Sequence, residues 1–169
     1  MVTRKTTVGD VFIVPVGDGR AGIGQVVADY GASAHYIAIF DGVMSLKMAE
    51  TQAVKATSSP VALLALSMDA KLYVGDWLTV GHAPVAAGMA LPAYKELVGV
   101  PDQFDVVDFS GNRRRRATPE EVGRLPYRKV VAPVRIENAL KASLGLGPWL
   151  QIFDDLRPKG HVTSADMFS

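Results

Sequence analysis

Four consecutive arginines, Arg113–Arg116, form the strongest cluster of charge in the chain. Guanidinium groups hold phosphates, and Arg124, Arg128 and Lys129 could extend the cluster into a surface for nucleic acid. In an extended strand, however, only every second arginine faces the same side, and no aromatic residue lies within the run to stack on a base. The pattern is equally typical of a solvated loop or of an edge strand whose charge prevents aggregation.

Three aspartates, Asp102, Asp105 and Asp108, precede the arginines and could pair with them across a hairpin. Such ion pairs would weaken the case for nucleic acid further. Asp105 and Asp108 are three positions apart, which places them on opposite faces of a strand, so a shared acid–base site is not expected. Four candidate contacts of a partner or, less favoured, of a nucleic acid remain: Arg113, Arg114, Arg115 and Arg116.

A second pattern with chemical meaning is G-x-G-x-x-G, spelled by residues 17–22. It binds the pyrophosphate of a dinucleotide only where a helix begins directly after it, because the free amides of the helix then meet the phosphates. Here the β-branched runs Val11–Val16 and Gly22–Val27 flank Gly17–Gly19, and Asp-Gly readily adopts the positive φ angles of a tight turn. The pattern therefore predicts a β-hairpin and no cofactor site.

No other pattern supplies a catalytic or metal site. The histidines His35, His82 and His161 lack the H-x-x-x-H or H-x-H spacing of metal ligands, and no G-x-S-x-G elbow presents a serine nucleophile. There are no cysteines, which excludes disulfides, thiol nucleophiles and cysteine-ligated zinc. We predict a protein that is not an enzyme and that carries no cofactor or metal.

The composition is that of an ordinary folded protein: 49% of the 169 residues are apolar, and the net charge is +1. This charge gives no general attraction to nucleic acid or to anionic membranes. The basic N-terminus has no apolar core behind it, and the longest apolar stretches are too short to cross a bilayer. We therefore expect a cytoplasmic protein that does not associate with membranes.

Short runs of β-branched and aromatic residues predict most of the fold as strands. The predicted strands cover residues 11–16, 22–27, 36–40, 61–66, 77–81, 104–109, 113–117 and 130–132. The predicted helices cover 44–57, a very short segment that starts with a capping box at Thr118, and 133–144, whereas 83–103 is expected to be irregular or partly helical. These elements predict an α+β, mostly β fold: a bent antiparallel sheet or a small, partly open barrel with a few peripheral helices. We expect a single domain over residues 1–157 and a flexible C-terminal tail over 158–169.

The first hairpin carries GDVFIVPV at residues 9–16, DGR at 18–20 and GIGQV at 22–26. This stretch resembles the opening of the bacterial Immunity protein 26 family. The spaced core that follows is similar too: Ile39–Asp41, Leu63–Leu66, and Trp77 with Val80-Gly81 after it. The resemblance covers residues 8–110, most specifically in the hairpin.

The resemblance implies a mostly β, non-catalytic protein of a polymorphic toxin system, whose partner is a cognate toxin that it binds and neutralises. It also implies a set of residues that determine the fold rather than contact the toxin: Gly9, Asp10, Asp18, Gly19, Gly22, Gly24 and Trp77. The near-neutral charge gives no sign of a basic nuclease as that partner, because inhibitors of basic nucleases are often acidic to steer association.

Two other functions remain open at this point. An endoribonuclease of the MazF/PemK kind also opens with Gly-Asp-Val and an apolar strand, but its next strand carries Arg-Pro before an apolar run. Here Arg20 is followed by Ala21-Gly22, so that motif is missing. A small-barrel RNA-binding protein that uses the arginine strand is the other alternative.

Overall fold

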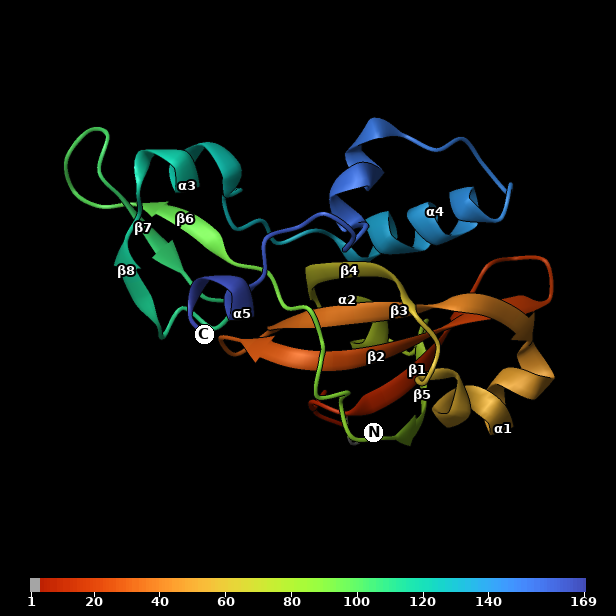
Figure 1. The fold of residues 1–169 in the computed structure, drawn as a ribbon. Coiled ribbons are helices and arrows are strands. Elements are labelled where there is room, and N and C mark those ends of the chain that lie inside the picture. The colour runs from red at the N-terminus through yellow and green to blue at the C-terminus, as the bar shows by residue number, and fades with distance from the viewer. Residues whose placement is uncertain (1–3) are drawn as a thin grey trace. The chain divides into compact units, whose positions relative to one another are not determined.

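The computed structural model describes residues 4–169, which divide into two compact units (Figure 1). The first unit runs to Ala87 and includes Val130–Pro158, and the second comprises Gly88–Lys129 with Lys159–Ser169. Each unit has its own antiparallel sheet and its own cluster of buried apolar side chains. The single domain over residues 1–157 that we expected stays a prediction.

The first unit is built on five antiparallel strands, in the spatial order β4-β3-β2-β1-β5. Their bounds are β1 (Asp10–Pro15), β2 (Arg20–Tyr30), β3 (Ala34–Ser45), β4 (Val61–Met68) and β5 (Leu78–His82). Strands β4 and β5 form the two ends of the sheet and, within residues 4–169, do not pair with each other. The predicted α+β class with an antiparallel sheet is therefore confirmed, and the sheet does not close into a barrel.

The first hairpin is confirmed in detail. Strands β1 and β2 pair with Ile13 opposite Ile23, and Gly17 and Gly19 in the turn have φ angles of 93° and 83°. Strand β2 continues through Gly22, which lies between β1 and β3. No helix begins there, so the G-x-G-x-x-G pattern has no free helical amides to offer to a phosphate.

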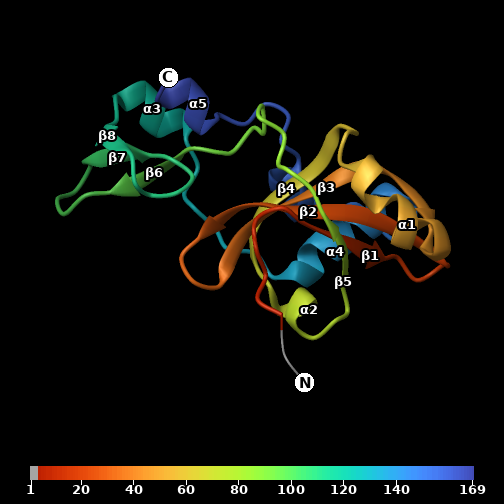
Figure 2. The ribbon, with the colours of Figure 1, turned by 90° about the horizontal axis from the view of Figure 1, so that it is seen from below.

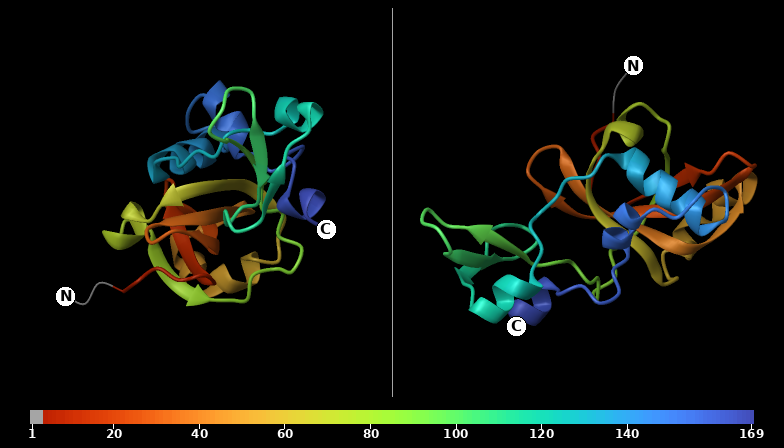
Figure 3. Two further views of the ribbon diagram at one scale, coloured as in Figure 1. Left: turned by 90° about the vertical axis from the view of Figure 1, so that its left-hand side faces the viewer. Right: turned by 90° about the horizontal axis from the view of Figure 1, so that it is seen from above.

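Two helices cover this sheet, as the top view in Figure 3 shows for α4 (Pro133–Ser143) and Figure 2 for α1 (Leu46–Ala56). Both helices were predicted. Glycine lets them approach the strands closely: a Cβ on Gly22 would lie 2.6 Å from Leu140 Cδ2, and one on Gly81 would lie 2.7 Å from Val54 Cγ2. Consecutive residues of β1 to β4 are consequently buried, so these strands contribute side chains to the core from both faces, whereas the edge strand β5 stays partly exposed.

Three shorter segments complete the first unit. Helix α2 (Ala70–Tyr73) precedes β5, and the 3-10 helix η1 (Gln151–Leu156) buries Phe153 and Leu156 in the core beside α4. The strand predicted over residues 130–132 is wrong. Val131 forms only an isolated parallel bridge with Ser67, because Pro133 begins a helix directly afterwards.

The second unit has a three-stranded antiparallel sheet in the order β6-β7-β8. Its strands are β6 (Tyr94–Leu97), β7 (Phe104–Val107) and β8 (Arg114–Arg116), and its helices are α3 (Pro119–Arg124) and α5 (Ser164–Met167). The predicted β7–β8 hairpin and the capping box of α3 are confirmed. Strand β6, however, lies in the segment that was expected to be irregular or partly helical.

Residues 159–169 fall within the segment that we expected to be a flexible tail. Ser164–Met167 within this segment form α5, which Figure 2 shows beside α3. The Ser164 hydroxyl donates to Pro92 O at 2.7 Å, and Met167 and Phe168 pack against a small core of Ala93, Val106 and Leu125. This segment therefore contacts residues that are distant in the sequence, and its own composition does not reveal these contacts.

Candidate interaction surface

The residues that carry the resemblance lie mostly inside the first unit. The Asp10 carboxylate is 2% exposed and accepts hydrogen bonds from Thr7 N at 3.0 Å and from Arg4 Nη2 at 2.8 Å. It therefore fixes the turn that leads into β1. Asp18 lies in the hairpin turn and holds the Arg20 guanidinium through two contacts of 2.8 Å and 2.6 Å.

Two glycines of the same set lie where a side chain would collide with a neighbour. A Cβ on Gly9, where φ is 98°, would lie 2.5 Å from His82 Cε1, and a Cβ on Gly24 would lie 2.4 Å from Phe12 Cζ. Trp77 is buried and stacks on Phe12 with 5.4 Å between the ring centroids. These contacts make the whole set candidates for fold determinants, a role that stays a prediction.

One row of residues in the first unit consists of an aspartate, a histidine and a serine, the residue types of a hydrolase triad. The sequence patterns did not indicate that these residues lie together. Asp29, His35 and Ser67 lie opposite one another on β2, β3 and β4. His35 Nδ1 is 2.6 Å from Asp29 Oδ1, but the buried Ser67 hydroxyl donates to Val131 O at 2.8 Å. A nucleophilic serine must donate to the histidine instead, so this row joins the strands and does not activate Ser67.

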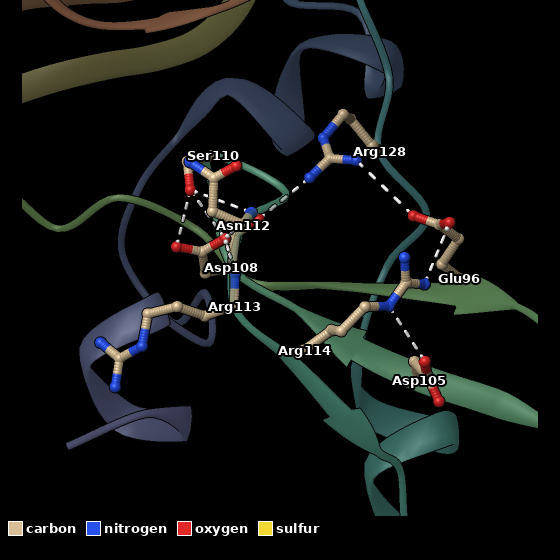
Figure 4. Close-up of polar contacts among 8 residues, drawn as sticks. All are labelled: Glu96, Asp105, Asp108, Ser110, Asn112, Arg113, Arg114 and Arg128. Carbon is tan, nitrogen blue, oxygen red and sulfur yellow. Dashed lines mark hydrogen bonds and ion pairs between the residues drawn. The ribbon is translucent and has the colours of Figure 1, made fainter.

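The second unit carries a row of alternating charges, some exposed and some half-buried, which we call the charged face: Glu96, Asp105, Arg114, Arg116 and Arg128. The row exists because Glu96, Asp105 and Arg116 are register partners on neighbouring strands. Figure 4 shows Arg114 between the two carboxylates, with Nη2 3.2 Å from Glu96 Oε1 and Nε 3.1 Å from Asp105 Oδ2. Arg116 Nε lies 3.5 Å from Asp105 Oδ1, and Arg128 Nη1 lies 4.0 Å from Glu96 Oε2.

The other two arginines of the run point to the opposite face of the sheet. Arg113 and Arg115 lie over the Phe168 ring, at 5.1 Å and 5.9 Å from its centroid. Arg115 also binds Glu121 through two contacts of 2.9 Å and 2.7 Å. The arginine run is therefore divided between two faces, as the period of a strand predicts, and one half stabilises the packing of α3 and α5.

Asp108 does not pair with an arginine side chain of β8, in contrast to Asp105. It is 4% exposed, and its carboxylate accepts from Ser110 Oγ at 2.9–3.0 Å, from Asn112 N at 3.0 Å and from Arg113 N at 3.2 Å. Arg128 Nη2 donates to the Asp108 carbonyl at 3.0 Å (Figure 4). These bonds fix the turn between β7 and β8, and so they position the start of β8.

The electrostatics of the charged face do not suit a phosphate chain. Three arginines and two carboxylates leave one net positive charge, and the signs alternate across the sheet. Hydrogen bonds to Glu96 and Asp105 raise the pKa of Arg114, so that the guanidinium is charged and oriented. A nucleic acid would bring its phosphates close to the two carboxylates as well as to the arginines. This geometry therefore favours a partner with separate charged side chains over one with a continuous row of phosphates.

The pairing of Arg115 with Glu121 gives a test of stability against pH. Hydrogen bonds from Arg115 and from Thr118 N lower the pKa of Glu121 to about 2 from an ordinary 4.5. The stabilisation is therefore complete above pH 4.5 and is lost as the pH falls toward 2. We expect Glu121→Gln to be less stable than the wild type at neutral pH and this difference to shrink on acidification, as measured by urea unfolding across the range. The exposed Glu120→Gln serves as the control; a constant difference for Glu121→Gln would contradict the assignment.

Comparison with known proteins gives a family match over the N-terminal half of the chain. Residues 7–96, which are 90 of the 169 residues, match the model of a protein family described as Immunity protein 26. The match includes all of β1 to β5 and ends inside β6, so it stops short of the expected limit at residue 110. The chain matches no curated protein and no solved structure. None of the helices formed by residues 4–169 combines the length and the apolar character needed to cross a membrane.

Proposed function

The chain belongs to the Immunity protein 26 family, and from this premise we propose that it binds a cognate toxin protein and neutralises it without catalysing a reaction. The observation that carries the proposal is the family match over residues 7–96. This match contains the complete five-stranded sheet of the first unit and the hairpin on which the resemblance rests. The toxin is then the partner, and this protein neutralises it by binding to its surface.

The hydrogen bonds of three polar side-chain groups in the first unit support a binding role. Asp10 accepts from the turn before β1, Ser67 donates to a backbone carbonyl, and Trp77 donates from Nε1 to Glu137 at 3.1 Å. Each of these groups is already used within the fold. A protein that acts through its surface needs such groups for stability only, and its specificity then depends on exposed side chains.

The two RNA-directed alternatives have less support. Arg20, which takes the place of the arginine in the endoribonuclease motif, is held by Asp18 in the hairpin turn. On β8, Arg114 and Arg116 lie beside Asp105, which places negative charge within the surface that RNA would have to approach. We therefore favour a protein partner over RNA.

Coexpression tests the proposed function directly. The toxin domain encoded by the neighbouring reading frame is expressed with and without this protein, with an unrelated protein of similar size as the control. We expect growth to be restored only by this protein, and we expect the purified pair to elute as one complex in gel filtration. If both proteins are folded and neither rescue nor a complex is seen, the assignment to that toxin is wrong.

A further inference from the structure

We propose that the outer edge of β8 binds an acidic, extended segment of the partner by strand addition, with carboxylates of that segment opposite Arg114 and Arg116. The identity of the partner as a toxin rests on the proposed function, whereas the chemistry of the docked segment rests on the second unit alone. An extended segment that joins a sheet edge gains main-chain hydrogen bonds, and its side chains at alternate positions supply specificity.

The backbone of β8 offers the hydrogen-bonding groups for such pairing. Ala117 N donates to Phe104 O at 2.9 Å and Asp108 N donates to Arg113 O at 3.0 Å, so these residues form the hydrogen-bonded pairs of the hairpin. In an antiparallel ladder the hydrogen-bonded pairs alternate with pairs whose backbone groups point outward. Arg114 and Arg116 are in the outward positions, and their N–H and C=O groups face away from β7.

The two edges of this sheet are not equivalent. At the β6 edge, Lys95 N donates to Pro126 O at 2.9 Å, and Lys95 forms a bridge with Tyr127, so this edge is covered by the chain itself. At the β8 edge, no further strand pairs with Arg114–Arg116 within residues 4–169. Among the residues that the structure describes, the outward groups have one hydrogen bond to a neighbouring side chain: Arg115 Nη1 donates to Arg116 O at 3.2 Å. A carbonyl oxygen has two lone pairs, so Arg116 O can also accept from a partner strand.

The charges of Arg114 and Arg116 determine which kind of segment can bind at this edge. The Arg114 and Arg116 side chains are 45% and 56% exposed, and each guanidinium has five N–H donors, of which its contacts with Glu96, Asp105 and Gln103 use only some. Carboxylates at alternate positions of an added strand would lie opposite both arginines. The remaining donors make such contacts possible without breaking the existing ion pairs.

Two other occupants of an open edge are disfavoured. A second copy of β8 would place arginine opposite arginine, and like charges in cross-strand positions are destabilising. RNA has no alternating N–H and C=O groups to pair with the backbone of Arg114 and Arg116, so it would gain no main-chain hydrogen bonds at this edge. The edge therefore accepts an acidic peptide strand while it rejects its own copy and RNA.

One further observation agrees with this location. The match to the family ends at residue 96, so β7 and β8 lie outside the part of the chain that the family model describes. A contact that distinguishes one toxin from another is expected in such a segment rather than in the shared sheet.

A pair of substitutions at one position separates the backbone from the charge. Arg114→Pro removes the outward N–H, and Arg114→Ser removes the same charge but keeps the N–H. Proline is tolerated on edge strands where its nitrogen faces solvent, so the fold is expected to survive, as circular dichroism and thermal unfolding would verify. The probe is a short fluorescein-labelled peptide that alternates glutamate with threonine, and the comparison probes are a lysine–threonine peptide and mixed single-stranded RNA.

We expect the wild type to bind the glutamate peptide in preference to the lysine peptide and to RNA, as measured by fluorescence anisotropy. Arg114→Pro is expected to bind about tenfold more weakly than Arg114→Ser, because one main-chain hydrogen bond is lost. The double variant Arg114→Ser, Arg116→Ser, which keeps the backbone edge, is expected to lose the preference for glutamate over lysine. Lys47→Ser, which removes an exposed charge in the first unit, is the control and is expected to bind like the wild type.

The results also separate this inference from the proposed function. Equal binding by Arg114→Pro and Arg114→Ser, no binding of the glutamate peptide to the wild type, or stronger binding of RNA would each overturn strand addition. If Arg114→Pro does not fold, an unchanged glutamate preference in the double variant would overturn it. When the toxin domain is used in place of the peptide, failure of the wild type to bind counts against the proposed function, whereas equal binding by all variants counts only against the edge.

Discussion

Trp77→Ala is expected to lower the free energy of unfolding by about 3–5 kcal/mol, the range measured for truncation of large buried aromatic residues. Trp77 is 1% exposed and lies nearly parallel to Phe12, with 4° between the ring planes and 5.4 Å between the centroids. Its Nε1 donates to Glu137 Oε2 at 3.1 Å, which connects the segment before β5 to α4. The substitution therefore leaves a cavity, removes an aromatic stack and breaks a partly buried hydrogen bond.

Two further variants identify which of these losses matters. Trp77→Phe keeps an aromatic ring beside Phe12 but removes the donor to Glu137, so we expect a smaller loss than for alanine. Trp149→Ala removes a half-buried tryptophan that packs edge-on against Phe153, and it serves as the matched control with a loss well below that of Trp77→Ala. Urea unfolding followed by circular dichroism measures all three. Similar losses for Trp77→Ala and Trp149→Ala would show that Trp77 is not a fold determinant.

Gly24→Ala is expected to cost about 1–3 kcal/mol of stability, which is the usual penalty for overpacking a core. Gly24 lies in β2, and its φ is not in the left-handed region, so the backbone itself would accept alanine. The added Cβ, however, would lie 2.4 Å from Phe12 Cζ and 3.0 Å from Ile39 Cδ1. Phe12 is fully buried and stacks on Trp77, so it has little freedom to move away.

Gly123→Ala is the control for this prediction. Gly123 lies in α3, has no atom within 4 Å of an added Cβ, and does not have a positive φ. Alanine is a better helix former than glycine, so Gly123→Ala is expected to be neutral or to stabilise by up to about 1 kcal/mol. The two variants are compared by thermal and urea unfolding. If Gly24→Ala proves as stable as Gly123→Ala, the close approach of β2 to Phe12 is not what requires glycine.

These predictions concern the first unit, and the interaction experiments concern the second. The first unit contains most of the residues that match the family, and its glycines and Trp77 make close packing contacts. The second unit exposes the arginine edge, and Asp108 fixes the turn before it. We infer that loss of Trp77 would abolish function through unfolding, whereas loss of Arg114 would change binding in a folded protein.

The sequence by itself determined the elements whose signals are local. β-Branched runs on both sides of Asp18-Gly19 predict the first hairpin, and Thr118 followed by Pro119 and Glu121 predicts α3 with its capping box. The apolar positions Ile136 and Leu140 predict α4. All these signals act over a few residues, through the turn geometry or the period of one element, so no knowledge of distant contacts is needed to recognise them.

Only the tertiary structure decided the features that depend on pairing between distant segments. Tyr94–Leu97 has no strong strand pattern and becomes β6 because β7 pairs with it on one side and Tyr127 on the other. The row of Asp29, His35 and Ser67 and the ion pairs of the charged face depend on cross-strand register. Register is set by which strands meet and where, and a shift of one residue would turn each side chain to the other face. The sequence alone shows that the arginines are present, whereas the tertiary structure decides which of them lie beside carboxylates and which edge of the sheet is open.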